Sequence, residues 1–160
     1  MTWPPASVSV ITAKEIEVRN AQTVEEVLQY SAGTVTDYYG SDDRNDYYLV
    51  RGYQATTYRD GLTLGSMRGV REEPFAYERV ELLRGANSTL FGMADPGGSV
   101  NFVTKTPRPE RFGEVQLTYG SFDHKAAAVD FGDLLNAEGT LAYRFTAKVQ
   151  KSDLEYDYSR

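Results

Sequence analysis

The chain has 160 residues, a net charge of −6 and no cysteine. Its length fits one domain, or one domain with part of another. The acidic balance leaves no basic footprint for nucleic acid, and the lack of cysteine excludes disulfides and thiolate metal sites. There is no run of about 18 apolar residues, so the sequence predicts no transmembrane helix. Residues 1–11 also lack the basic and apolar regions of a secretory signal peptide.

Two short helices are predicted near the N-terminus, after a strand at 8–11. A T-x-x-E capping box begins at Thr12, and a second one begins at Thr23. In such a box the threonine and the acidic side chain satisfy backbone amides that the first helical turn leaves free. We therefore expect one helix that runs to about Val18 and another that Gly33 ends.

The middle of the chain alternates between polar loops and short apolar runs. Asp60-Gly61 is a hairpin-turn signal, because both residues tolerate the positive φ that a tight turn requires. The elements expected here are a loop at 34–46, a strand at 47–53, a strand pair at 56–64, a loop at 65–73 and a helical turn at 74–77.

Residues 78–105 predict two strands separated by a glycine-rich stretch. This stretch contains no histidine, no cysteine and no phosphate-binding lysine motif. Glycine lets a backbone turn sharply and approach its neighbours closely, so we interpret the stretch as a scaffold without catalytic residues. The structural role is assigned to Gly52, Gly85, Gly92, Gly97 and Gly98.

The pattern changes after a proline-containing linker at 106–109. Apolar and polar residues then alternate in segments at 113–122, 126–131 and 139–151. Such segments are typical of transmembrane β-barrel strands, although a half-buried antiparallel sheet in a soluble protein gives the same alternation. Three strands cannot close a barrel, which needs about eight. The chain is therefore interpreted as a small domain at 1–107, followed at 108–160 by the first strands of a truncated barrel.

Six sequence blocks occur in a characteristic order: VSVITAKEI, TVEEVLQYSAG, YYLVRGY, DGL, ERVELLRGANSTLFG and PGGSVNFVTKTP. Over residues 6–160 the chain resembles the plug domain of TonB-dependent outer-membrane receptors, most closely ferric-siderophore receptors of the ferrichrome, hydroxamate type. The resemblance implies an α+β fold. A globular plug with a small mixed β-sheet and short helices would be followed by antiparallel strands that begin a transmembrane β-barrel.

The resemblance also implies a function without enzymatic activity. The protein would lie in the outer membrane of a Gram-negative bacterium, bind a ferric siderophore outside the cell and gate its TonB-driven uptake into the periplasm. Iron would arrive inside the chelate, and no cofactor would bind directly. The implied partners are the siderophore, TonB, the protein's own barrel and the membrane, with no nucleic acid. TonB would act through an N-terminal segment that residues 1–7 do not resemble.

Two groups of site residues follow from the resemblance. The loops at 36–46 and 65–71 would face the siderophore, and aromatic rings with a few donors suit a compact chelate. The expected contacts are Tyr38, Tyr39, Arg44, Met67 and Arg68. A polar cluster of Arg51, Glu81 and Arg84 would pair the plug with carboxylates of the barrel wall. Without those partners we expect these charges to be solvated.

Other functions remain open from the sequence. The nutrient could be another chelate, or the protein could be a siderophore-sensing signal transducer. A small soluble β-rich hydrolase and a module that associates through its edge strands are more remote alternatives. Asp42, Asp43 and Asp46 lack the spacing of a calcium loop, and His124 is the only histidine. We therefore predict neither a metal site nor a catalytic residue.

Overall fold

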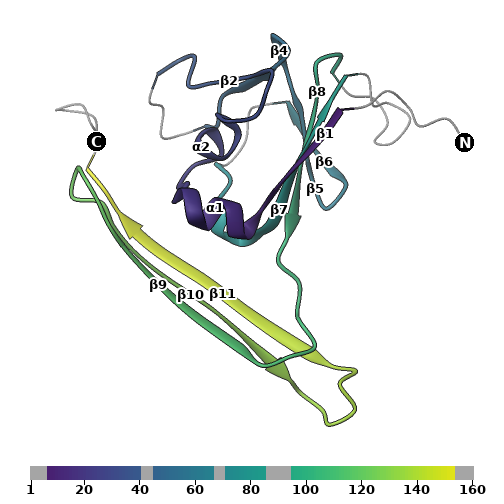
Figure 1. The fold of residues 1–160 in the computed structure, drawn as a ribbon, viewed down its shortest axis with the longest axis vertical. Coiled ribbons are helices and arrows are strands. Elements are labelled where there is room, and N and C mark those ends of the chain that lie inside the picture. The colour runs from purple at the N-terminus through teal and green to yellow at the C-terminus, as the bar shows by residue number, and fades with distance from the viewer. Residues whose placement is uncertain (1–6, 41–44, 67–70, 86–94, 154–160) are drawn as a thin grey trace, which may run out of the picture. The chain divides into compact units, whose positions relative to one another are not determined.

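The computed structural model describes residues 7–40, 45–66, 71–85 and 95–153 (Figure 1). The chain divides into two compact units, Met1–Lys105 and Thr106–Arg160. Within the described residues, no helix has both the length and the hydropathy needed to cross a membrane.

A five-stranded mixed sheet forms the frame of the first unit (Figure 1). Its strands, in spatial order, are β1 (Ser7–Thr12), β7 (Tyr77–Arg84), β8 (Gly98–Thr104), β5 (Thr56–Arg59) and β6 (Leu62–Ser66). Only β5 and β8 pair in parallel. A second sheet contains β2 (Thr34–Thr36), β3 (Tyr48–Val50) and β4 (Tyr53–Gln54), and one 3-10 turn, η1 (Pro74–Ala76), precedes β7. The predicted combination of a mixed sheet with short helices is confirmed.

Both predicted helices begin at their capping threonines. The helices are α1 (Ala13–Arg19) and α2 (Val24–Leu28). In α1 the Thr12 hydroxyl accepts a hydrogen bond from the Glu15 amide at 3.3 Å, and Thr23 does the same for Glu26 at 3.2 Å. The second helix ends at Leu28, before Gly33. The Leu28 carbonyl accepts hydrogen bonds from the Ser31 amide and the Thr34 hydroxyl, both at 2.8 Å.

The core of the first unit lies on one face of the five-stranded sheet. Alternate residues of a strand point to the same face of the sheet. The buried strand residues on this face pack against the apolar side of α2. The central members of this cluster are Val24, Val27, Leu28, Val80, Leu82, Val100 and Phe102, each at most 1% exposed. Packing against this face holds α2, which is too short to be stable by itself.

Two tight turns shape the middle of the chain. The Asp60-Gly61 hairpin is confirmed, with φ angles of 50° and 79°. The stretch at 47–53, predicted as one strand, is a second hairpin, because Arg51 and Gly52 adopt φ angles of 53° and 83° between β3 and β4. Arg-Gly is a less familiar signal for this turn than Asn-Gly or Asp-Gly. The loop at 34–46 also contains a strand that was not predicted, β2.

The second unit is a three-stranded antiparallel sheet. Its strands are β9 (Phe112–Tyr119), β10 (Lys125–Leu134) and β11 (Ala142–Lys151), with β10 in the centre. Figure 1 shows the three long strands side by side. The three predicted strands are confirmed, and their alternation produces one exposed apolar face. Its large side chains are Val115, Leu117, Tyr119, Phe131, Tyr143, Phe145 and Val149.

The opposite face of this sheet carries a buried ion pair. The Arg144 Nε and Nη2 atoms donate to the two carboxylate oxygens of Asp130 at 2.8 and 2.7 Å. Both side chains are at most 4% exposed. The Thr106 carbonyl accepts another hydrogen bond from Arg144 at 3.0 Å. This bidentate geometry is the strong form of an arginine–carboxylate pair.

The cap of α2 gives a simple test of the local structure. We expect Thr23→Ala to lower the free energy of unfolding by about 1 kcal/mol, because the Glu26 amide loses its acceptor. Thr23→Ser should retain most of that stability, since its hydroxyl can still cap the helix. Urea denaturation of the two variants checks the difference. Equal losses would show that the threonine methyl group, and not the cap, stabilises the helix start.

Candidate functional site

Three tyrosine rings gather near the first predicted ligand loop. Tyr38 and Tyr39 lie within a turn in which the Gly40 amide donates to the Asp37 carbonyl at 2.9 Å. Their ring centroids are 4.5 Å apart, and the Tyr47 ring lies 5.0 Å from Tyr39 and 6.0 Å from Tyr38. We call these three residues the tyrosine cluster. Because Tyr39 is 72% exposed, the cluster offers an accessible aromatic surface with phenol groups.

The phenol of Tyr38 is a neutral group at physiological pH. Burial raises its pKa above the ordinary value, and the nearby Tyr39 and Tyr47 raise it further. A protonated phenol both donates and accepts hydrogen bonds. The cluster can therefore contribute aromatic contact area and neutral hydrogen-bonding groups without adding charge.

The other predicted ligand contacts, Arg44, Met67 and Arg68, lie outside the described residues. So do Asp42 and Asp43, whose spacing does not match a calcium loop. The described residues contain no group of three or more acidic or histidine side chains arranged for a metal ion. The ligand site thus remains a prediction, with Tyr38 and Tyr39 as its described members.

Arg84 lies in a buried position next to neutral acceptors. It is 7% exposed, and its Nε donates to the Ala32 carbonyl at 2.6 Å. Its Nη1 donates to the hydroxyls of Ser9 and Ser7 at 2.9 and 3.2 Å. The expectation that this charge would be solvated is wrong, because β1 supplies two hydroxyls and the turn after α2 supplies a carbonyl.

Arg51 approaches the same region from the turn between β3 and β4. Its amide donates to the Gly33 carbonyl at 2.7 Å. Its Nη1 lies 3.5 Å from the point that a β-carbon on Gly85 would occupy. Arg51 is exposed, whereas Arg84 is buried. The structure therefore brings both arginines to the segment at 32–33, in two different environments.

Glu81 does not join the two arginines. Residues 81 and 84 of β7 are separated by an odd number of positions, so their side chains point to opposite faces of the sheet. On its own face Glu81 accepts from the Arg79 Nε at 2.7 Å and from the Asn101 Nδ2 at 2.9 Å. The predicted cluster is thus divided between two faces of the sheet within the described residues.

Two of the five selected glycines occupy points of close backbone approach. A β-carbon on Gly97 would lie 2.1 Å from the Val50 carbonyl oxygen, and one on Gly98 would lie 2.1 Å from the Leu83 carbonyl oxygen. Gly52 and Gly85 have positive φ angles. Gly92 lies outside the described residues.

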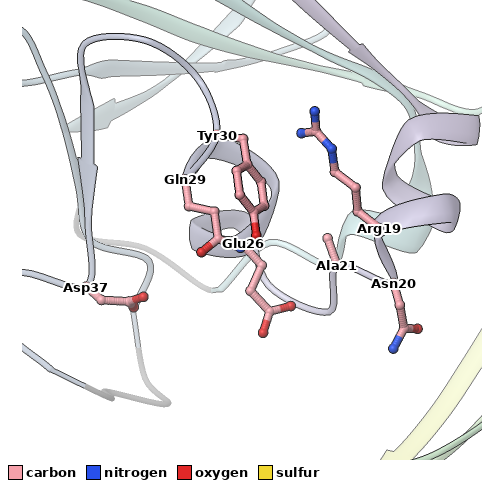
Figure 2. Close-up of a pocket in the computed structure, with 7 residues that line it drawn as sticks. All are labelled: Arg19, Asn20, Ala21, Glu26, Gln29, Tyr30 and Asp37. Atoms are coloured by element: carbon pink, nitrogen blue, oxygen red, sulfur yellow. The ribbon is translucent and has the colours of Figure 1, made fainter.

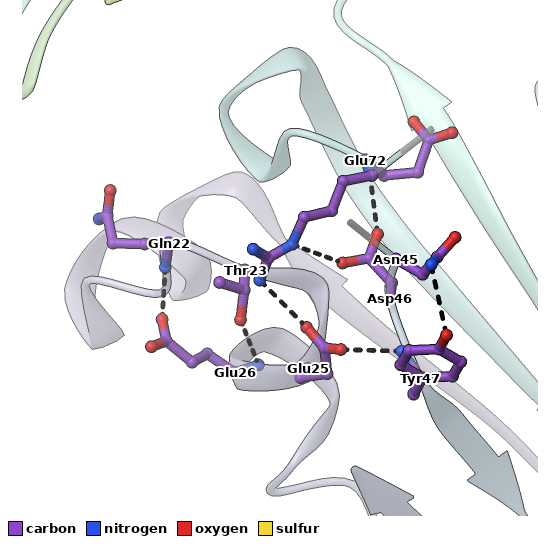
Figure 3. A network of polar contacts seen from close by, with 9 residues as sticks. Gln22, Thr23, Glu25, Glu26, Asn45, Asp46, Tyr47 and Glu72 are labelled. Atoms are coloured by element: carbon purple, nitrogen blue, oxygen red, sulfur yellow. Dashed lines mark hydrogen bonds and ion pairs between the residues drawn. The ribbon is translucent and has the colours of Figure 1, made fainter. Parts of the chain in front are cut away.

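A buried charged network was missed by the sequence analysis (Figure 3). The Glu25 Oε1 atom accepts from the Tyr47 amide at 2.8 Å. The Arg71 Nη2 lies 3.5 Å from the Glu25 Oε2, and its Nε donates to the Asp46 Oδ1 at 3.3 Å. The second oxygen of Asp46 accepts from the Glu72 amide at 2.8 Å. We call Glu25, Asp46 and Arg71 the acid–arginine triad.

Burial dominates the electrostatics of the triad. The Glu25 and Asp46 side chains are 5% and 8% exposed, whereas Arg71 is 32% exposed. Burial raises the pKa of both carboxyl groups above their ordinary values, because a low-dielectric environment disfavours the charged form. The Asp46 charge raises the pKa of Glu25 further, while the Tyr47 amide and Arg71 act in the opposite direction.

A sequence signal for this network exists but is weak. Glu25 lies three positions before Leu28 in the helix, so it shares part of the apolar side of α2. An acidic residue at such a position indicates a buried partner, yet it does not identify Asp46 or Arg71.

An open hollow of about 610 Å³ lies beside the two helices (Figure 2). It is lined by Arg19, Asn20, Ala21, Glu26, Gln29, Tyr30 and Asp37. The Arg19 guanidinium lies over the Tyr30 ring at 5.1 Å and also pairs with Glu15. Among the described residues, the buried polar atoms without a hydrogen-bond partner belong to other positions.

Comparisons with known proteins agree with this architecture. The family model of the TonB-dependent receptor plug domain matches residues 4–99. A ferrioxamine receptor of Yersinia enterocolitica is 33% identical over 162 residues, covering 96% of this chain and 22% of the relative. The ferrichrome outer membrane transporter and phage receptor of Escherichia coli K12 is 32% identical over 158 residues, covering 94% and 21%.

Solved structures give the same result. The outer-membrane ferripyoverdine receptor of Pseudomonas aeruginosa, bound to ferripyoverdine, matches with a TM-score of 0.81 at 26% identity. The match covers 92% of this chain and 20% of that receptor chain. A mixed sheet with few short helices is thus the architecture of a receptor plug.

The chain belongs to the TonB-dependent receptor plug domain family. The resemblance drawn from the six sequence blocks is confirmed. The chain spans about a fifth of the length of the curated relatives that it matches.

Proposed function

We propose that this chain is the plug, with the first barrel strands, of an outer-membrane receptor that takes up a ferric siderophore. The plug binds the chelate outside the cell and gates its TonB-driven entry into the periplasm of a Gram-negative bacterium. Ferric iron is cargo inside the chelate, and the plug performs no reaction on it. The family match over residues 4–99 carries the proposal, and relatives named for ferrioxamine and ferrichrome support a siderophore as the ligand.

The tyrosine cluster supports a compact chelate as the cargo. Its rings present apolar area, and its phenols present neutral donors and acceptors, a combination that suits ligand pockets. In our proposal Arg44, Met67 and Arg68 complete this surface. In the same proposal Arg51, Glu81 and Arg84 are the plug residues that pair with carboxylates of the barrel wall. Arg51 is exposed, whereas Arg84 already donates to neutral acceptors of the plug.

The second unit supports a place in a membrane barrel. Its sheet has an exposed apolar face and, on the other side, the buried pair of Asp130 and Arg144. Alternation of lipid-facing and lumen-facing residues is typical of outer-membrane strands. We assign residues 108–160 to the start of the barrel and residues 1–107 to the plug.

The proposal is tested with the complete receptor gene. The gene should restore growth to an iron-starved bacterium that lacks its own siderophore receptors, when ferrioxamine or ferrichrome is supplied. A matched strain without TonB should not grow. Growth on neither chelate, with the receptor present in the outer membrane, would reject ferrioxamine and ferrichrome as cargo. Uptake that continues without TonB would reject the transport mechanism.

The tyrosine cluster gives a direct prediction about affinity. We expect Tyr39→Ala in the complete receptor to weaken siderophore binding by roughly tenfold, because each well-placed aromatic contact is worth about 1 kcal/mol or more. Tyr53→Ala is the control, since Tyr53 is also exposed, at 58%, but lies in β4 and outside the predicted ligand loops. Calorimetric titration measures both affinities. An equal loss in the two variants would exclude a specific role for Tyr39.

A further inference from the structure

The C-terminal ends of the two candidate ligand loops both contact the acid–arginine triad. Asp46 and Tyr47 close the loop at 36–46, and Arg71 and Glu72 close the loop at 65–71. The Tyr47 amide donates to Glu25, and the Glu72 amide donates to Asp46, both at 2.8 Å. Each loop end is therefore held by a carboxylate of the acid–arginine triad (Figure 3).

The triad also controls the position of an aromatic contact. Tyr47 is one residue of the tyrosine cluster, with its ring 5.0 Å from Tyr39, and its backbone amide is the group held by Glu25. Any change in the charge of Glu25 acts directly on the amide of a residue that packs against the candidate ligand surface.

We propose that Glu25, Asp46 and Arg71 are positioning residues that share one proton and hold the described loop ends at Tyr47 and Glu72, and through Tyr47 the tyrosine cluster, in the binding arrangement. The assignment of the loops as ligand-facing rests on the proposed function; the proton-sharing anchor does not. With one proton on the carboxyl pair the triad is neutral. With none it carries one excess negative charge in a buried position, which is costly.

The charged groups around the triad do not neutralise its excess negative charge. Glu72 accepts from the Arg59 Nη2 at 2.5 Å and from the Tyr77 hydroxyl, so Arg59 is already matched by another carboxylate. Tyr48, next to the triad, is a neutral phenol whose pKa burial raises, and its hydroxyl bonds to Thr57 at 2.7 Å. Arg71 is thus the cation that serves both Glu25 and Asp46 among the described residues.

The sign of the pH effect follows from the two carboxyl groups. Folding raises the pKa of Glu25 above 4.5 and that of Asp46 above 3.8, so the folded state binds protons more tightly than the unfolded state. Stability is then greatest below these ordinary values and falls as the pH rises through the raised ones. The loop ends should loosen in the same pH interval.

Glu25→Gln isolates this effect. The amide oxygen can still accept from the Tyr47 amide, and its NH₂ group imitates the protonated acid, so the variant mimics the one-proton state. In the wild-type chain we expect the hydrogen-exchange protection of the Tyr47 and Glu72 amides to fall by about tenfold as the pH rises through the raised carboxyl pKa values. In Glu25→Gln that fall should disappear. Amide exchange measured on the complete receptor in detergent, corrected for intrinsic exchange rates, gives both values.

Glu26→Gln is the matched control, because it makes the same change on the next residue of α2. Glu26 accepts from the Gln22 amide at 2.6 Å and contacts neither Asp46 nor Arg71 in the described structure. It should retain the wild-type pH dependence. Protection that is independent of pH in the wild type, or an unchanged pH dependence in Glu25→Gln, would overturn the proposal. A fold lost in Glu25→Gln would also overturn it, since the one-proton mimic must be stable.

A second experiment links the anchor to the ligand. In the complete receptor, ferrioxamine affinity should fall as the pH rises in the wild type and stay constant in Glu25→Gln. If ferrioxamine does not bind at any pH while the exchange result holds, ferrioxamine is rejected as the cargo and the anchor remains. If the chelate binds with the same pH dependence in both proteins, the anchor does not position the ligand loops.

Discussion

Gly97→Ala should destabilise the first unit by about 3 kcal/mol or more, the upper end of the cost of overpacking. The added methyl group would lie 2.1 Å from the Val50 carbonyl oxygen and 2.9 Å from the Tyr53 β-carbon. The Val50 carbonyl cannot move easily, because Val50 is fully buried in β3 and the carbonyl belongs to the backbone. Relief would require the start of β8 to separate from the turn between β3 and β4. Urea denaturation of the 160-residue chain measures the loss.

Gly52→Ala separates steric overlap from backbone strain. Gly52 has a φ of 83°, but a β-carbon there meets nothing within 4 Å. Its replacement should cost only about 1 kcal/mol, the strain of a left-handed residue. If Gly97→Ala costs no more than Gly52→Ala, close approach is not the reason for glycine at position 97.

Arg144→Met should be the most damaging single change in the second unit, at about 3–5 kcal/mol. It leaves the Asp130 carboxylate, which is 1% exposed, without its bidentate partner. The Thr146 hydroxyl at 3.2 Å is too weak a donor to compensate for a buried charge. Urea unfolding of the complete receptor in detergent gives the change in free energy.

A double variant tests whether loss of the charge partner is the cause. Asp130→Val combined with Arg144→Met removes both charges, and such replacements of buried pairs are often nearly neutral. We expect it to recover most of the lost stability. Arg111→Met provides the exposed comparison, because Arg111 is 86% exposed and lies 3.7 Å from Asp133; its cost should stay below about 1 kcal/mol. A double variant as unstable as Arg144→Met would point to packing in place of charge.

These expectations depend on features that the sequence reveals to different degrees. Local signals identified the elements well. The capping threonines at 12 and 23 placed both helix starts, Asp60-Gly61 placed a hairpin, and alternation placed the three strands of the second unit. Each signal involves only a few neighbouring residues. It is either a side chain that caps a nearby backbone amide or the alternation of apolar and polar residues along a strand. A single sequence shows such patterns directly.

The order of the six blocks identified the family, because relatives keep the same scaffold. It did not show that Glu81 and Arg84 lie on opposite faces of the sheet, or that Arg84 bonds to Ser7 and Ser9. The hairpin at Arg51-Gly52 was also missed, since a turn there depends on the pairing of β3 with β4. These features depend on which strands become neighbours.

The sequence by itself determined where both helices begin, where the Asp60-Gly61 hairpin turns, how the strands of the second unit alternate and which family the chain belongs to. Only the tertiary structure decided that residues 25, 46 and 71 meet in one buried triad, and that Gly97 touches the backbone of Val50. The physical reason is distance along the chain. Burial and charge pairing arise when packing brings remote segments together, and each segment alone gives no sign of the partner it will meet.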